Sequence, residues 1–376
     1  MKKTLAIVAA VMLATTTFAA DKVRISGKLG ELKGDTMFVM IQYADGNETK
    51  EMFMSKNGEF DYSFEPKEVG WAYLVVSCER RGKVTYGYID FTAVPGEHAQ
   101  FSGTVNDYKI TGSHFYQKAA EVDAIEDKFE ADSKALSEKK KALRDDKSLS
   151  DDEKEKRYNG YIEEYDKKVS VAAMDYIRQN PNEEATALAL HKIWCDDMDK
   201  AAKLLSANVK NGRMKPICDK AIERAQKEIK LRENAKKVTE GKVAPDFTLM
   251  DINGKPFTLS SLRGKYVILD FWGSWCGWCI KGIPDMKKYY AKYPGKFEIV
   301  GVDCNDTDAK WKEAVKKHEL PWIHVKNEKG EKDISTKYAV KGYPTKIIVD
   351  PKGNIDKIIV GEGPTFYTYL DSLFGK

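Results

Sequence analysis

The sequence predicts an α/β domain at the C-terminus, preceded by an all-β, sandwich-like domain and a charged helical segment. Three observations support this fold class. Short runs of β-branched and aromatic residues fill 21–112, apolar residues recur at helical spacing in 113–238, and strand-like and helix-like runs alternate in 239–376. A chain of 376 residues is long enough for two or three domains, each with its own core.

The composition excludes several classes of protein. The formal charge is only +4 although 32% of the residues are charged, which argues against a dedicated nucleic-acid binder. A hydrophobic content of 42% argues against disorder. Six cysteines are too few for a disulfide scaffold. The sequence has no run of 18 apolar residues, so no transmembrane segment is expected.

Residues 1–20 have the order of a secretory signal peptide. Lys2 and Lys3 are basic, Thr4 to Ala14 is an apolar run, and small residues lead to a cleavage site after Ala19 or Ala20. The alternative is a buried N-terminal strand. A signal peptide places the mature protein in the periplasm or elsewhere outside the cytoplasm, where disulfides persist.

The β region, 21–112, is predicted from strand-like runs separated by turn signals at 44–47 and 56–59. Such spacing fits an antiparallel sandwich or small barrel. We find no catalytic constellation in this region, and Cys78 is expected to pack as a small hydrophobe. The expected strands include Val23–Gly27, Thr36–Tyr43, Trp71–Cys78 and Tyr86–Phe91.

The helical region, 113–238, contains two long antiparallel helices joined by 145–152. Ser150 and Glu153 form a predicted capping box at the start of the second helix. Further helices are expected over 185–195 and 216–237. Acidic and basic residues are interspersed, which favours a solvated helix face over a nucleic-acid surface.

Two arrangements in the helical region stay open. His191 and Cys195 are four residues apart, a spacing that suits two metal ligands, but no second such pair exists and ordinary packing is favoured. Cys195 and Cys218 are candidates for a disulfide between neighbouring helices, which sequence spacing cannot decide.

The last region, 239–376, alternates strands and helices and ends in a hairpin turned at 351–354, so its sheet has an antiparallel edge. The expected strands are 247–250, 266–272, 297–303, 346–350 and 355–360. The expected helices are 276–293, 309–318 and a short one near 334–338.

Cys276 and Cys279 form a CxxC pair that follows a buried-type strand and opens a helix. Zinc would need a second ligand pair, which the sequence lacks, so a redox pair is favoured and no metal is expected. The unpaired N–H groups of a helix N-terminus stabilise a thiolate. Such placement lowers a cysteine pKa from about 8.5 to roughly 3.5–7.5.

Residues 243–376 resemble the thioredoxin-fold domains of TlpA/ResA-type extracytoplasmic proteins. The resemblance rests on Ala244–Leu249 followed by Gly254, on Leu262–Trp272, on the CxxC pair and on Gly342–Thr345. It implies a thioredoxin fold and a thiol:disulfide oxidoreductase. More loosely, 21–238 resemble the β domain and helical insert found ahead of such domains in secreted Bacteroidetes proteins.

The resemblance also implies roles for individual residues. Cys276 would attack the substrate and Cys279 would resolve the mixed disulfide, with the Cys276–Cys279 disulfide as the sole redox group and no other cofactor. Pro344 would be a cis-proline that shapes a substrate groove near Tyr343. The remaining expected substrate-binding residues lie beside or between the cysteines: Trp275, Gly277 and Trp278.

Two departures from the family pattern matter. ResA-type proteins often carry Glu three residues after the second cysteine, where this chain has Gly282, whereas Asp270 stands where they often have Asn. We expect Asp270 to accept the proton of Cys279, because a carboxyl group in an apolar strand has a raised pKa. The alternative is an incidental polar group. The second departure, Trp278, bears on the redox potential in a direction that the sequence does not give.

The resemblance favours a reductase of extracytoplasmic proteins, supplied with electrons by a membrane protein of the DsbD or CcdA type. Disulfide oxidase and isomerase are the nearest alternatives. The resemblance also makes the domain AhpC/TSA-like, because the Ala244–Phe247 hairpin is shared with peroxiredoxins. A thiol peroxidase is nevertheless disfavoured, because no Thr stands three residues before either cysteine. A binding protein with an accessory redox domain is the last alternative. Cys304 ends a strand at the same edge as the CxxC pair and is either a third thiol of the site or, as we favour, structural.

Overall fold

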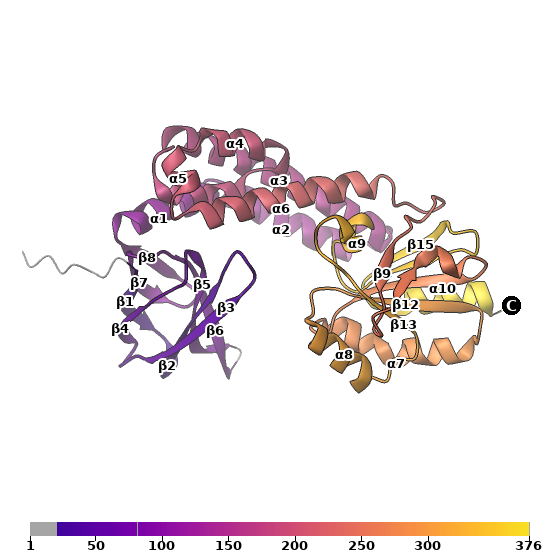
Figure 1. Cartoon of the computed structure of the whole chain (residues 1–376). Coiled ribbons are helices and arrows are strands. Elements are labelled where there is room, and N and C mark those ends of the chain that lie inside the picture. The colour runs from indigo at the N-terminus through magenta and orange to yellow at the C-terminus, as the bar shows by residue number, and fades with distance from the viewer. Residues whose placement is uncertain (1–20, 81, 376) are drawn as a thin grey trace, which may run out of the picture. The chain divides into compact units, whose positions relative to one another are not determined.

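The computed structural model describes residues 21–80 and 82–375 (Figure 1). Contacts divide the chain into two compact units, one ending at Ala225 and the other beginning at Gln226. The predicted signal peptide lies outside the described residues. Within the described part, no helix combines the length and the apolar character needed to cross a membrane.

The first unit contains two four-stranded sheets, with strand orders β4-β1-β7-β8 and β3-β2-β5-β6. Ile25 of the first sheet and Leu74 of the second lie in one hydrophobic core, so the sheets enclose apolar side chains between them, as expected of a sandwich. The strands are β1 (Val23–Gly30), β2 (Leu32–Gln42), β3 (Glu48–Met54), β4 (Glu59–Phe64), β5 (Gly70–Arg80), β6 (Lys83–Ala93), β7 (His98–Thr104) and β8 (Tyr108–Gly112).

The helices of the first unit share that core. Phe115, Val122 and Ile177 belong to the same cluster as the strand residues, and the Tyr116 hydroxyl donates to the Thr92 carbonyl at 2.8 Å. The β and helical regions are thus one packed body. The helical elements are α1 (His114–Asp127), α2 (Glu130–Asp145), α3 (Asp151–Gln179), η1 (Glu184–Lys192), η2 (Cys195–Asp197), α4 (Met198–Leu204), α5 (Ala207–Asn211) and α6 (Lys215–Ala235).

The start of α3 confirms the predicted capping box. The Ser150 backbone N–H donates to Glu153 Oε2 at 3.0 Å, and the Glu153 N–H donates to Ser150 Oγ at 3.3 Å. The helix expected over 185–195 is instead the 3-10 segment η1, in which five of the nine residues are buried and the buried positions do not follow a 3.6-residue period. The unit boundary falls inside α6 rather than at 238/239, since the last turns of α6 contact later residues, as in the Lys341–Glu228 ion pair at 2.8 Å.

The candidate metal pair and the candidate disulfide of the first unit consist of side chains that are buried or partly buried. Burial lowers the pKa of His191 to about 4, and its ring packs edge-on against Trp71 at 5.5 Å. Cys218 is a buried free thiol, so the structure contains no Cys195–Cys218 disulfide. Among the described residues no group of three or more His, Cys, Asp and Glu side chains is arranged to hold a metal ion.

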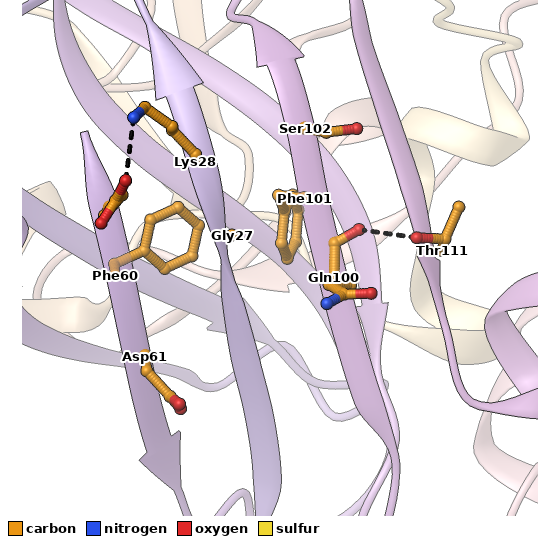
Figure 2. Close-up of a pocket in the computed structure, with 9 residues that line it drawn as sticks. Gly27, Lys28, Phe60, Asp61, Gln100, Phe101, Ser102 and Thr111 are labelled. Atoms are coloured by element: carbon orange, nitrogen blue, oxygen red, sulfur yellow. Dashed lines mark hydrogen bonds and ion pairs between the residues drawn. The ribbon is translucent and has the colours of Figure 1, made fainter.

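A shallow pocket of about 750 Å³ lies over β1, β4 and β7 (Figure 2). Its lining includes Gly27, Phe60 and Phe101. Its charged side chains are already engaged, because Lys28 pairs with Glu59 at 2.8 Å and Asp61 accepts a hydrogen bond from Arg24.

The second unit is built on a five-stranded sheet in the order β13-β12-β11-β14-β15. β11, β12 and β13 run parallel, and β14 and β15 are antiparallel, as the hairpin at 351–354 predicts. The strands are β9 (Thr248–Met250), β10 (Pro256–Thr258), β11 (Tyr266–Trp272), β12 (Phe297–Asp303), β13 (Ile323–Lys326), β14 (Thr345–Val349) and β15 (Ile355–Val360). The helical elements are η3 (Leu259–Leu262), α7 (Gly277–Lys292), α8 (Asp308–Lys317), η4 (Gly330–Lys332), α9 (Ile334–Lys337) and α10 (Pro364–Phe374).

Each face of this sheet has its own core because side chains along a strand alternate between the faces. Ile268 and Trp272 of β11 pack with α7, α8 and α10, whereas Val267, Leu269 and Phe271 pack with α9 and with β9. The face covered by α7 is the one that receives both cysteines. The sequence patterns missed β10, β13 and α10, which are short or begin immediately after turn residues.

Candidate active site

The CxxC pair lies at the end of the central strand. β11 is hydrogen-bonded between β12 and β14, and the chain leaves it through Gly273–Trp275 to enter α7. Cys276 is the N-cap of α7, and its Sγ accepts a hydrogen bond from the Cys279 backbone N–H at 3.1 Å. The sulfur of Cys276 therefore faces the positive end of the helix, where N–H groups have no partner within the helix.

Cys276 and Cys279 are joined by a disulfide, the pairing that the sequence predicts. Their exposed fractions are 6% and 5%, so in the oxidised form burial alone does not distinguish an attacking thiol from a resolving one. The residues around them are much more accessible, with Trp275 53% and Trp278 61% exposed. Gly277 is exposed as well, and Lys281 Nζ lies 4.7 Å from the Trp278 ring centroid.

Asp306 anchors the loop that precedes the cysteines. Its carboxylate accepts hydrogen bonds from the Ser274 N–H at 2.6 Å and from the Ser274 hydroxyl at 2.7 Å. Burial alone would raise the pKa of Asp306, but the neighbouring Asp303 and the hydrogen bonds from Ser274 lower it. Asp303, at the end of β12, is fully buried, and burial followed by the neighbouring Asp306 raises its pKa to about 8.

Sequence reasoning missed Ser274, Asp303 and Asp306. The available signal was an acidic residue at the end of a strand, followed by a second acidic residue three positions later, at the edge of the sheet where the CxxC loop also lies. Because the carboxyl ends of parallel neighbours meet at one edge, β12 brings these acids beside the loop after β11.

Cys304 lies next to the site but is fully buried. Its Sγ is 3.6 Å from the Val302 carbonyl, and burial raises the pKa of its thiol to about 12. Its backbone carbonyl accepts the Trp275 indole N–H at 2.9 Å. These observations favour the structural role for Cys304 and give it a part in orienting Trp275.

The Tyr343–Pro344 peptide bond is cis, as predicted. The Tyr343 ring meets the Trp275 ring edge-on with centroids 5.3 Å apart, so this segment borders the CxxC loop. The Pro344 carbonyl accepts the Gly361 N–H at 2.8 Å, which ties the segment to the residue after β15. The structure thus brings Trp275, Tyr343 and the two cysteines together.

Asp270 belongs to a buried cluster of charged side chains on the sheet face that α7 covers. It is the cross-strand partner of Lys346, whose Nζ lies 3.8 Å from Asp270 Oδ1 and 2.8 Å from Glu362 Oε2. Lys346 is 1% exposed and Asp270 is 5% exposed. Burial raises the pKa of Asp270, the neighbouring Lys346 opposes this effect, and Glu362 adds to it.

Lys346 and Glu362 were not expected from the sequence. Lys346 is a charged residue inside an apolar strand, which was the only local signal, and Glu362 lies in the loop after β15. Their approach depends on the antiparallel register of β11 with β14 and of β14 with β15, which a single sequence does not specify.

A family model described as the AhpC/TSA family matches residues 241–358. The thiol-disulfide oxidoreductase ResA of Bacillus cereus is 40% identical over 127 residues, which cover 34% of this chain and 72% of that protein. The chain belongs to the AhpC/TSA family. It is an enzyme, a thioredoxin-like thiol-disulfide oxidoreductase, like the relatives that it resembles.

Two further proteins of the same kind are each 33% identical to this oxidoreductase. ResA of Bacillus subtilis is 33% identical over 125 residues, covering 33% of this chain and 69% of that protein. The solved thioredoxin domain of a thiol-disulfide oxidoreductase from Bacteroides vulgatus is 33% identical, covers 36% of this chain and 98% of that chain, and gives a TM-score of 0.33. The family model matches a range, 241–358, that contains the CxxC pair.

Proposed function

We propose that this oxidoreductase reduces disulfides of extracytoplasmic proteins through Cys276 and Cys279. The observation that carries the proposal is the Cys276–Cys279 disulfide at the start of α7, bordered by two exposed tryptophans. A redox pair at a helix N-terminus suits thiolate chemistry, and exposed aromatic side chains beside it suit contact with another polypeptide.

The reaction begins with the reduced enzyme. The Cys276 thiolate attacks one sulfur of a substrate disulfide, a mixed disulfide forms, and the other substrate sulfur leaves and takes up a proton. Cys279 then loses its proton to the Asp270 carboxylate, and its sulfur attacks Cys276. The mixed disulfide breaks, the second substrate thiolate leaves and is protonated, and the Cys276–Cys279 disulfide forms. The substrate gains two electrons, which the enzyme loses, and its two thiolates take up two protons from the solvent, to which Asp270 later returns the proton of Cys279.

The local structure supports each of these roles. The Cys279 N–H that donates to Cys276 Sγ at 3.1 Å is a suitable partner for a thiolate at that sulfur. Asp270 is buried on the sheet face that packs against α7, as Cys279 is, and its raised pKa makes it a stronger base than an exposed aspartate. Trp275, Gly277, Trp278, Tyr343 and Pro344 form the expected substrate-binding surface.

The cellular setting is part of the proposal. The signal-like residues 1–20 support export to the periplasm or another extracytoplasmic compartment. A reductase in that compartment needs a source of electrons, and we propose a membrane thiol reductant of the DsbD or CcdA type as the partner. The Bacteroidetes type of domain arrangement belongs to the same proposal.

Paired assays test the direction of the reaction. In the first, the enzyme with a dithiol reductant should accelerate insulin reduction, and in the second its oxidised form should give little disulfide formation in a reduced, unfolded substrate. Cys276→Ser should abolish the first activity. Faster oxidation or reshuffling than reduction would instead identify an oxidase or isomerase, and hydrogen peroxide consumption at a comparable rate would identify a thiol peroxidase.

A further inference from the structure

Gly282 leaves a space on α7 that Glu362 fills. Gly282 lies three residues after Cys279, so the two residues share one face of the helix. A Cβ atom built on Gly282 would lie 2.3 Å from Glu362 Oε2 and 2.9 Å from Glu362 Oε1. The carboxylate of Glu362 therefore occupies the position that a side chain at 282 would take, one turn beyond Cys279.

The groups around Glu362 hold it in that position. Lys346 Nζ lies 2.8 Å from Oε2, and the Tyr367 hydroxyl donates to Oε1 at 2.9 Å. The same hydroxyl lies 3.2 Å from the Gly282 carbonyl, which links the cluster to α7 a second time. The side chains of Lys346 and Glu362 are 1% and 10% exposed, so this ion pair is shielded from solvent.

The cluster contains one cation and two carboxylates. Glu362 pairs closely with Lys346, whereas Asp270 Oδ1 is 3.8 Å from the ammonium group and has no hydrogen-bond partner. One positive charge cannot neutralise two buried carboxylates, and a buried excess charge is costly. The cluster is therefore neutral when it binds one additional proton, and Asp270 is the carboxylate left to bind it.

We propose that Lys346 and Glu362 are positioning residues that set the proton affinity of Asp270, with Glu362 supplying from the loop after β15 the acidic group that α7 lacks at Gly282. This inference rests on the proposed function for its purpose, which is to keep Asp270 basic enough to take the Cys279 proton. Its physical content, the opposite influence of the two residues on Asp270, stands without any substrate.

The proton transfer is balanced within the cluster. When Cys279 attacks the mixed disulfide, its S–H proton moves to Asp270, the cluster passes from one net negative charge to neutral, and the sulfur carries the electron pair into the new S–S bond. The titratable side chains in contact with Asp270 or Glu362 are Lys346 from β14 and Tyr367 from α10, and Cys279 of α7 lies in the core on the same face of the sheet. Asp285 of α7 acts on Tyr367 through its charge.

Substitutions of Glu362 and Lys346 should shift the pKa of Asp270 in opposite directions. Glu362→Gln leaves Lys346 with Asp270 as its only carboxylate partner in the cluster, which favours the ionised form and lowers the pKa of Asp270. Lys346→Met removes the cation and therefore raises the pKa of Asp270. Each shift should be about one pH unit or more, the usual effect of a charge within several ångströms. In the double variant Lys346→Met/Glu362→Gln, the pKa of Asp270 should lie between its values in the two single variants.

The experiment is a carboxyl-carbon NMR titration of Asp270 in the oxidised, full-length protein, with the signal assigned by Asp270→Asn. Glu240→Gln is the matched control, because Glu240 pairs with Lys357 at 2.9 Å in a more exposed setting and its loss should leave Asp270 unchanged. Gly282→Ala keeps all the charges but displaces the Glu362 carboxylate. It should therefore lower the pKa of Asp270 by less than Glu362→Gln does. This variant replaces the charge variants if they do not fold.

Opposite shifts in the pKa of Asp270 in Glu362→Gln and Lys346→Met support the proposal. Shifts of the same sign, or no shift in any of these variants, overturn it. The pH profile of mixed-disulfide resolution provides the second readout, in which Glu362→Gln should move the acidic limb to lower pH and Lys346→Met should move it to higher pH. Because the NMR titration needs no substrate, an unshifted Asp270 in an enzyme that reduces insulin refutes only this inference. Opposite shifts in an enzyme without that activity refute only the proposed function.

Discussion

The Cys279 backbone N–H donates a hydrogen bond to Cys276 Sγ at 3.1 Å, in the first turn of α7. This relationship places a backbone donor of the helix N-terminus beside one sulfur of the redox pair. The same turn contains Gly277 and the exposed Trp278, which leave the approach to that sulfur bordered by an aromatic side chain. Local backbone geometry thus gives the two cysteines of one motif different chemical surroundings.

In the reduced enzyme, iodoacetamide should modify Cys276 faster than any other cysteine at neutral pH. The helix N-terminus stabilises its thiolate, so the rate should stay near its maximum as the pH falls through the ordinary thiol pKa, about 8.5, and should drop only at lower pH. Peptide mapping by mass spectrometry at several pH values measures this. Equal modification of Cys276 and the exposed model thiol glutathione at every pH would refute the stabilisation.

Trp278→Ala should impair reduction of protein disulfides while sparing small ones. The Trp278 side chain is 61% exposed, so its removal should change the free energy of unfolding by less than about 0.5 kcal/mol. We expect the KM for insulin to rise several-fold and the rate with glutathione disulfide to stay near that of the wild type. Tyr86→Ala, which removes a 55% exposed ring from the first unit, is the control. Equal losses with both substrates would mean that Trp278 acts on the disulfide itself.

Asp306→Ala should loosen the loop before the CxxC pair. It removes two hydrogen bonds to a carboxylate, each worth about 1.5–3 kcal/mol, and leaves the Ser274 N–H without its acceptor. We expect a loss of at least about 2 kcal/mol in the free energy of unfolding, measured by urea denaturation, and slower insulin reduction. Asp308→Ala is a control, because Asp308 makes an exposed ion pair with Lys326. Similar stability losses in both variants would contradict the anchoring role.

The buried Asp303 carboxyl group should make the free energy of unfolding depend on pH. Its pKa is raised to about 8 in the folded protein from an ordinary value of 3.8, so the folded state binds the proton more tightly. The resulting stabilisation is complete below about pH 4 and is lost as the pH rises to 8, by up to about 1.4 kcal/mol per unit. Asp303→Asn should remove this contribution, so its stability relative to the wild type should increase from pH 5 to pH 8. A pH-independent difference in urea unfolding would show that Asp303 does not titrate in this window.

Cys304→Ala should retain the thiol-disulfide exchange activity of the wild type. The Cys304 thiol is fully buried, with a pKa raised to about 12, and the Trp275 indole binds the backbone carbonyl, which the substitution keeps. Insulin reduction should therefore change less than twofold. A loss comparable with that of Cys276→Ser would reinstate Cys304 as a third thiol of the site.

The sequence predicted the parts of the site that depend on local pattern. Cys276 and Cys279 lie within four residues between a strand and a helix, and Pro344 lies in a short motif, so their placement needed no long-range information. Ser150 and Glu153 were likewise predictable as a capping box, because both partners lie in one turn.

The charge cluster was not predictable in this way. Asp270, Lys346 and Glu362 come from three separate segments, and they meet only because β14 pairs with β11 in one particular register. The contact between Asp306 and Ser274 also depends on two neighbouring strands ending at the same edge. The 3-10 conformation of η1 was also not predicted, because its apolar residues do not distinguish it from an α-helix.

The central claim is that Cys276 attacks a protein disulfide and Cys279 resolves the intermediate. Its most direct test is mass spectrometry of the reduced Cys279→Ser variant after incubation with insulin. We predict a stable adduct through Cys276 that a dithiol reductant releases, and none with Cys276→Ser under the same conditions. An adduct through another cysteine, or equal adducts in both variants, would contradict the claim.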